Sequence, residues 1–279
     1  MEINEENELA LFADLVEIEI GRREKRPMCE TCGRPSGVCW CRNLNGEKVS
    51  TNCRVFILQH PHEEKRCLRT VPILEALIPK ENCSVIKGKK FNPSRCPELK
   101  NELSNENSIL MYPGQNAVDI EDLPPVGGPQ LPYNIFILDG TWQQAKSMFF
   151  RNPYLRDLKQ VRLSGRHISE YVIRRQPTDD ALSTVEVVAV ALSTLEQDWK
   201  IYSSLVEPLK LICQYQMDHG AVKHHSKEYL ILTGRYQKPV GKRTYKKFKK
   251  CGVRNSDPCV WELRRNLNES EVGNREDNK

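Results

Sequence analysis

A carboxylate and an indole follow directly after a short apolar segment in the middle of the chain. Residues 134–138 predict a β-strand, and residues 139–142 read Asp, Gly, Thr and Trp. Thr141 and Gln144 have the spacing of a capping box that opens a helix. Ligands of open α/β sheets bind outside the carboxyl ends of strands, so this position favours a binding site. A turn followed by a core tryptophan is the structural alternative.

Polar or turn-forming residues also follow other predicted strand ends. They are His60 to Arg66 with Arg69 and Thr70 after the strand 54–59, Tyr112-Pro113-Gly114 after the next apolar strand, and Leu182-Ser183-Thr184-Val185-Glu186 at the start of an apolar helix. Singly, each is explained by a turn or by a capping box. Together they predict that several polar segments meet at one edge of a sheet.

Four cysteines near the start of the chain have the spacing C-x2-C-x6-C-x-C; they are Cys29, Cys32, Cys39 and Cys41. A C-x2-C pair places two sulfurs at adjacent vertices of a Zn²⁺ tetrahedron, and the second pair completes it. Four thiolates leave no open coordination position, so the predicted zinc is structural. Free thiols or a redox pair are the alternative. The other cysteines are scattered, and we expect most to be reduced.

Strand-like and helix-like segments alternate after the cysteines, which is typical of an α/β fold with a mainly parallel sheet. The expected strands are residues 54–59, 84–86, 109–112, 134–138, 160–163 and 171–173. The expected helices are residues 63–77, 141–150, 184–195 and 205–219. The segment 124–129, rich in proline and glycine, predicts a surface loop.

Composition divides the chain into four parts: an acidic segment (1–27), the zinc knuckle (28–45), an α/β domain (50–235), and a basic, then polar tail (236–279). The 279 residues, of which 39% are hydrophobic, suffice for one large core and a small satellite. We expect the tail to be largely disordered, because it has few apolar residues beyond Trp261.

Basic residues are concentrated in two places that suit RNA. Residues 235–250 carry eight bases and no acid, with aromatic residues between them; a nuclear import signal is the alternative. The second stretch contains Arg162, Arg166, His167, Arg174 and Arg175. No apolar run approaches the roughly 18 residues that span a bilayer. The amino terminus is acidic rather than basic and then apolar, so we expect a nuclear or cytosolic protein without membrane contact.

In this order, the motifs resemble the DTW-domain family of tRNA-uridine aminocarboxypropyltransferases. The residues that carry the resemblance are Gln59-His60-Pro61 with Glu63 and Thr70, Tyr112-Pro113-Gly114, Asp139-Gly140-Thr141-Trp142 with Ala145 and Lys146, Leu182-Ser183-Thr184 with Glu186, and the cysteine knuckle. The similarity runs from about Cys29 to about Gly220, and residues 171–178 look closest to the second eukaryotic subgroup. Other branches have Asn-Thr where this chain has Arg69-Thr70.

The resemblance implies a knotted fold related to SPOUT RNA methyltransferases, with S-adenosylmethionine bound in the loops of the knot. It implies transfer of the 3-amino-3-carboxypropyl group to N3 of a D-loop uridine in tRNA (acp3U formation), releasing methylthioadenosine. No protein partner is implied. Two rival functions remain open: a SPOUT-type RNA methyltransferase, and a zinc-knuckle RNA-binding protein without catalysis.

The family motifs also imply where the co-substrate binds. The cofactor-binding candidates are Glu63, Thr70, Tyr112, Pro113, Gly114, Gly140, Thr141, Leu182, Ser183, Thr184 and Glu186. Amide groups at the helix starts near Thr141 or Thr184 are suited to a carboxylate. Glu186 either touches a ribose or only caps its helix.

The catalytic candidates are Asp139 and Trp142. Uridine N3 is a poor nucleophile while protonated, so its attack on the cofactor's γ-carbon requires that the proton leave. Asp139 either takes this proton, for which it must be buried, or stays ionised and orients the uracil or stabilises the sulfonium. Trp142 stacks on uracil or adenine, or else only packs.

Overall fold

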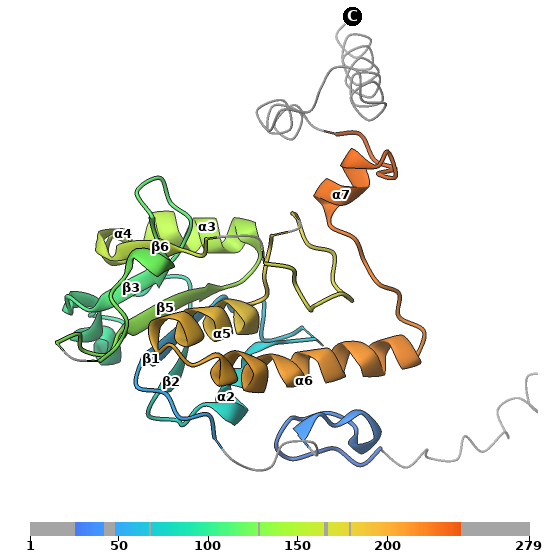
Figure 1. The fold of residues 1–279 in the computed structure, drawn as a ribbon, viewed down its shortest axis with the longest axis horizontal. Helices are drawn as coiled ribbons and strands as arrows, with labels where there is room; N and C mark the ends of the chain where they lie inside the picture. The colour runs from blue at the N-terminus through green and yellow to red at the C-terminus, as the bar shows by residue number, and fades with distance from the viewer. Residues whose placement is uncertain are drawn as a thin grey trace, which may run out of the picture. The chain divides into compact units, whose positions relative to one another are not determined.

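The computed structural model describes residues 26–41, 48–66, 68–127, 129–164, 167–178 and 180–240. Residues up to Cys39 form one unit, and residues from Trp40 onward form a second, larger one. The larger unit is built on one six-stranded parallel sheet (Figure 1). The predicted acidic segment up to residue 25 and the basic run 242–250 lie outside the described residues.

The strands are β1 (Arg54–Gln59), β2 (Cys83–Lys87), β3 (Ser108–Met111), β4 (Val118–Asp119), β5 (Asn134–Asp139) and β6 (Lys159–Arg162). Their order is β2-β1-β5-β3-β6-β4. β1 and β5 are neighbours in the middle of the sheet, and their register places Gln59 beside Asp139. All carboxyl ends therefore face one edge, where the polar segments predicted from the sequence meet.

Helices cover both faces of this sheet (Figure 1). α2 (Val71–Leu77), α5 (Thr184–Leu195) and α6 (Trp199–Asp218) lie on one side, and α3 (Trp142–Arg151) and α4 (Pro153–Asp157) lie on the other. The short elements are η1 (Ser36–Val38), η3 (Pro97–Leu99), η4 (Glu102–Ser104), η5 (Ile120–Asp122) and α7 (Lys227–Leu232). Among the described helices, none is both long and apolar enough to cross a bilayer.

Alternation along the strands explains how the two faces are filled, because successive side chains point to opposite sides of a sheet. Phe56 and Phe136 point to the same face, where their rings stack with centroids 4.9 Å apart. Met148 and Phe149 of α3 complete that core cluster. This packing fixes α3, and with it the residues at its first turn.

Most of the predicted elements are confirmed. The strand 54–59 and the helix 184–195 have the predicted bounds, and four other predicted strands and the helix 141–150 agree to within one residue at each end. The described part of the segment 124–129 contains no helix or long strand, as expected for a loop. Apolar runs bounded by glycine, proline or asparagine are sufficient to locate such elements.

One predicted strand is wrong, and two predicted helices begin at other residues than expected. Residues 171–173 are not a strand, because local hydrogen bonds, such as Val172 N–H to the Glu170 carbonyl, close a turn there. The helix 63–77 begins only at Val71, with Pro72 in its first turn. The helix predicted from residue 205 begins earlier, at Trp199, because the Asp198 side chain caps its amino end.

Candidate functional site

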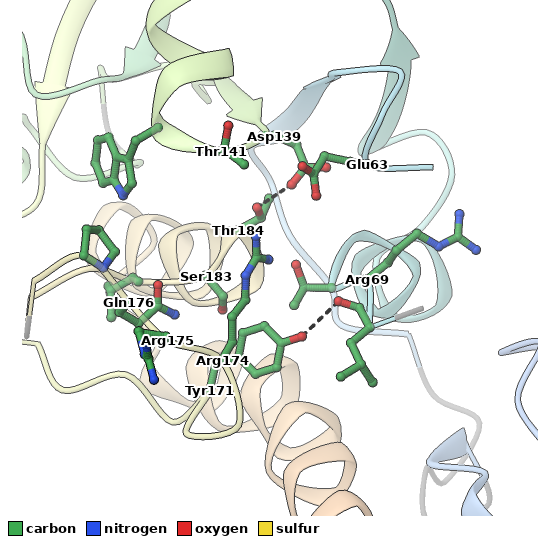
Figure 2. Close-up of a pocket in the computed structure, with 16 residues that line it drawn as sticks. Glu63, Arg69, Asp139, Thr141, Tyr171, Arg174, Arg175, Gln176, Ser183 and Thr184 are labelled. Atoms are coloured by element: carbon green, nitrogen blue, oxygen red, sulfur yellow. Dashed lines mark hydrogen bonds between the residues drawn. The ribbon is translucent and has the colours of Figure 1, made fainter. Parts of the chain in front are cut away.

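A cavity lies at the carboxyl ends of β1 and β5, beside the amino end of α5 (Figure 2). It is called the polar cavity here. Most of the predicted site residues line it: Glu63, Thr70, Asp139, Gly140, Thr141, Trp142, Leu182, Ser183 and Thr184. The structure thus brings together residues that are up to about 120 positions apart in the sequence, as the parallel sheet requires.

Asp139 is the last residue of β5, and both of its carboxylate oxygens are held by neighbouring side chains. Gln59 Nε2, at the end of β1, donates to Oδ2 at 2.9 Å, and Thr184 Oγ1, at the start of α5, donates to Oδ1 at 2.6 Å. Asp139 is buried, as the proton-acceptor role requires. The two bonds fix the carboxylate of β5 to β1 and α5, which favours a positioning role.

The turn after Asp139 is shaped by the start of α3. Thr141 and Gln144 form the predicted capping box, with Gln144 N–H donating to Thr141 Oγ1 and Thr141 N–H to Gln144 Oε1. There is little room for a side chain at Gly140, because a Cβ there would lie 3.1 Å from the Gln144 side chain and 3.5 Å from the His60 side chain. Trp142 is 54% exposed at the cavity edge, so the predicted alternative of a core tryptophan is wrong.

Glu63, in the turn after β1, is the second buried carboxylate of the polar cavity. Its Oε2 pairs with Arg66 Nε at 3.0 Å. Its Oε1 is buried and accepts no hydrogen bond from the described residues. Burial raises the pKa of the Glu63 carboxyl; the Arg66 charge opposes this shift and the Asp139 charge adds to it.

The irregular segment after β6 covers one side of the polar cavity. The buried Tyr171 donates its hydroxyl to the Leu68 carbonyl at 2.9 Å, which joins this segment to the loop before α2. Arg174 and Arg175 line the cavity, and Figure 2 shows the Arg174 side chain running toward Thr184. The sequence placed both arginines near the predicted pocket and assigned them to RNA, but it did not predict that they line the cavity itself. Their position depends on a loop without periodicity.

Glu186 is held entirely by its own helix start and the adjacent loop. Its carboxylate accepts from Ser183 N–H, Ser183 Oγ, Ser169 Oγ and Glu170 N–H at 2.6–2.9 Å. Glu186 is 1% exposed and lines neither this cavity nor the apolar one described below. Of the two roles predicted from the sequence, these contacts support capping.

We expect replacement of Glu186 by alanine to destabilise the fold without removing any group from the cavities. Several buried donors would lose their acceptor, at a cost of about 3 kcal/mol. A loss of that size lowers Tm by roughly 6–12 °C in a domain of this size. Thermal unfolding followed by circular dichroism measures it, with Glu106→Ala, an exposed acid, as control. An unchanged Tm would contradict the capping role.

A second cavity, called the apolar cavity here, adjoins the first. Gly140, Trp142, Leu182 and Thr184 line both. Its other walls include Tyr112 and Pro113, as predicted, together with apolar residues that were not among the predicted site residues: Met111, Ile137, Leu138, Ala145, Val161, Leu163, Ala181 and Val187. Their apolar character alone did not separate them from core residues.

Gly114 lines neither cavity, although the sequence placed it among the cofactor-binding residues. A Cβ at this position would overlap the side-chain oxygen of Gln160, in β6. The overlap involves the tip of a flexible side chain, which can move, so packing alone does not require a glycine here.

The sulfurs of Cys29, Cys32, Cys39 and Cys41 all lie within 4.8 Å of one another. In a Zn²⁺ site with bonds of 2.3 Å, sulfurs are about 3.8 Å apart. The Cys32 and Cys39 sulfurs are 3.7 Å apart, so the cluster fits a closed four-thiolate site. Hydrogen bonds from the Cys32 backbone and the Cys39 side chain lower the pKa of Cys29 to about 6, which favours the thiolate.

The described cysteines outside this cluster, Cys53, Cys83, Cys96 and Cys213, form no disulfide. All four are buried.

Comparison with known proteins adds independent evidence. The family model of the DTW domain matches residues 26–217. The chain is similar to proteins named tRNA-uridine aminocarboxypropyltransferase 2 from Drosophila melanogaster, Macaca fascicularis and Mus musculus. The identities are 42%, 41% and 41%, over 83%, 83% and 82% of this chain and 92%, 78% and 76% of the relatives. No solved structure matches the chain.

Proposed function

Since the chain belongs to the DTW-domain family, we propose that it is a tRNA-uridine aminocarboxypropyltransferase. The reaction would transfer the 3-amino-3-carboxypropyl group of S-adenosylmethionine to N3 of a D-loop uridine and release methylthioadenosine. The observation that carries the proposal is the match to relatives of that name over most of the chain. Incubating the protein with tRNA and the co-substrate, followed by mass spectrometry of the nucleosides, tests it. We expect acp3U; its absence would contradict the proposal.

The two adjoining cavities suggest how the co-substrate binds. The adenosyl group suits the apolar cavity, where Tyr112 stacks on Phe149 with ring centroids 4.0 Å apart. The charged amino-acid group suits the polar cavity with its arginines and carboxylates. Gly140 and Thr184, which line both, would lie next to the sulfonium. This pose exposes the γ-carbon to the polar cavity, which explains transfer of aminocarboxypropyl rather than methyl.

Within this pose, Asp139 would orient the uracil and stabilise the positive sulfonium, because its carboxylate is buried and fixed. Trp142, exposed at the junction of the cavities, is placed to stack on an incoming base. Loops after β3 and β6 and the segment before α5 contribute to the apolar cavity, in keeping with a knotted SPOUT-like path. The proposed location is the nucleus or the cytosol.

A cluster of bases beside the site suggests where tRNA phosphates bind. Lys87, Lys89, Lys90, Arg95 and Arg151 line a cavity with no acid among its lining residues, here called the basic pocket. Gly88 N–H in its wall donates to the Gln59 carbonyl, so the pocket and Asp139 lie at the same sheet edge. Burial lowers the pKa of His60, and the charges of His62 and Lys89 lower it further. Lys87 of this pocket is paired with Glu64, and Arg162, outside the pocket, is paired with Asp119.

We expect the double variant Lys89→Gln and Lys90→Gln to weaken tRNA binding and to flatten its salt dependence. Each lost phosphate contact lowers the slope of log affinity against log salt by about one unit. Titrations of tRNA at several salt concentrations measure it. The matched control is Lys80→Gln with Lys159→Gln, two exposed lysines before β2 and at the start of β6, at the opposite sheet edge. An unchanged slope would exclude the basic pocket.

We also propose that the four-cysteine cluster binds a structural Zn²⁺, in keeping with its sulfur distances. Protein purified without added metal should carry about one equivalent of zinc. Cys39→Ser should lose zinc and lower Tm, because metal binding couples to folding. Cys96→Ser, a buried cysteine outside the cluster, is the control. Metal analysis showing less than about half an equivalent would count against the site.

A further inference from the structure

The polar cavity contains two buried carboxylates, and only one of them is satisfied by the protein. Asp139 accepts a hydrogen bond at each oxygen. Glu63 is 6% exposed, and its Oε1 accepts none from the described residues. A buried oxygen without a donor costs free energy, so it indicates a ligand group that supplies one. The missing donor must enter the polar cavity, since Glu63 lines it.

The charges around Glu63 indicate which kind of donor fits. Arg66, in the same turn, pairs with Oε2, and Arg174, from the segment after β6, also acts on the Glu63 charge. The charge of Asp139 in β5 raises the pKa of Glu63, whereas the charges of His62 and of the two arginines lower it. Two carboxylates thus face two guanidinium groups. The amino-acid group of the co-substrate, with one ammonium and one carboxylate, leaves this charge balance unchanged, and so does a neutral donor such as uracil N3–H.

Figure 2 shows the Glu63 carboxylate next to that of Asp139, whose charge contributes to raising the pKa of Glu63. From the functional assignment above it follows that uridine N3–H enters the same cavity. We propose that Glu63 Oε1, rather than Asp139, accepts the N3 proton of the target uridine. This inference rests on the proposed function.

In this step the N3–H bond breaks as the proton moves to Glu63 Oε1. The electron pair left on N3 forms the bond to the γ-carbon. The bond between the γ-carbon and sulfur breaks, and its electron pair stays on sulfur, which leaves neutral methylthioadenosine. Asp139, held by Gln59 and Thr184, keeps the uracil in place. The raised pKa of Glu63 brings it closer to that of the group it deprotonates, which improves a general base.

The test compares Glu63→Gln with wild type at saturating co-substrate. We expect the transfer rate to fall by a factor on the order of 10²–10⁴, with unchanged co-substrate affinity by calorimetry. The wild-type rate should rise through the raised pKa of Glu63 to a plateau. In the variant that limb should disappear, and the rate should rise only in the alkaline range, where N3 ionises by itself. Glu63→Asp should restore part of the rate.

A substrate with a more acidic N3 separates this role from a structural one. Fluorine at C5 of uracil withdraws electrons and acidifies N3–H, so tRNA containing 5-fluorouridine depends less on a base. We expect it to restore much of the Glu63→Gln rate and little of the Asp139→Asn rate. Three results would overturn the proposal: a normal Glu63→Gln rate, no gain with fluorouridine, or a defect confined to co-substrate affinity. Wild-type transfer, measured in parallel, tests the proposed function separately.

Discussion

Asp139→Asn is expected to lower the transfer rate by a factor on the order of 10³ while leaving the fold intact. Asparagine has the same shape, and its amide can still bond to both neighbours: Gln59 Nε2 donates to the remaining oxygen, and the Thr184 hydroxyl rotates to accept. What is lost is the negative charge that orients the uracil for attack. Single-turnover transfer to tRNA at saturating co-substrate measures the effect.

Thermal unfolding and co-substrate binding serve as controls for this variant. Tm should stay close to wild type, because the hydrogen bonds of Asp139 to Gln59 and Thr184 persist. Co-substrate affinity should fall moderately, because the sulfonium is already positive in the bound co-substrate. A single-turnover rate near that of wild type would contradict both roles considered for Asp139, the positioning role and the proton-accepting role.

Arg174→Ala is expected to weaken co-substrate binding by a factor on the order of 10 to 100. The carboxylate of the co-substrate's amino-acid group would lose a charged donor in the polar cavity. The Arg174 side chain runs into the cavity toward Thr184 (Figure 2). It also lowers the pKa of Glu63, so its removal should move the acidic limb of the rate to higher pH. Calorimetry of co-substrate binding and a pH profile measure the two effects.

Arg156→Ala is the matched control, because Arg156 is exposed and lines none of the three cavities, whereas Arg174 is partly buried and lines the polar one. It should leave co-substrate affinity unchanged. Equal losses in the two variants would indicate a general electrostatic effect, and an unchanged affinity in Arg174→Ala would exclude the proposed contact.

The sheet and the turn from Asp139 to Trp142 could be predicted because their sequence signals are local. Strands such as 54–59 are apolar runs with turn formers on both sides, and the capping boxes at Thr141 and Ser183 mark helix starts directly. A start signal was present but missed at α2, where Thr70 precedes Val71 and Pro72.

The residues that hold Asp139 and cover the polar cavity could not be predicted in the same way. That Gln59 and Thr184 hold Asp139 depends on strand order and register, which no local pattern encodes. The segment around Tyr171 and Arg174 has no periodicity, so its place over the cavity is determined by tertiary contacts such as the bond from Tyr171 to Leu68. The unpartnered oxygen of Glu63 is visible only in three dimensions.

The central claim is that the co-substrate presents its γ-carbon, and not its methyl group, to a uridine in the polar cavity. Incubation of the protein and tRNA with S-adenosylmethionine labelled either in the carboxyl group or in the methyl group tests this directly. We predict that the carboxyl label alone becomes attached to tRNA. Methyl label on tRNA would show a methyltransferase, and no label on tRNA from either co-substrate would show a binding protein without this activity; either result would contradict the account.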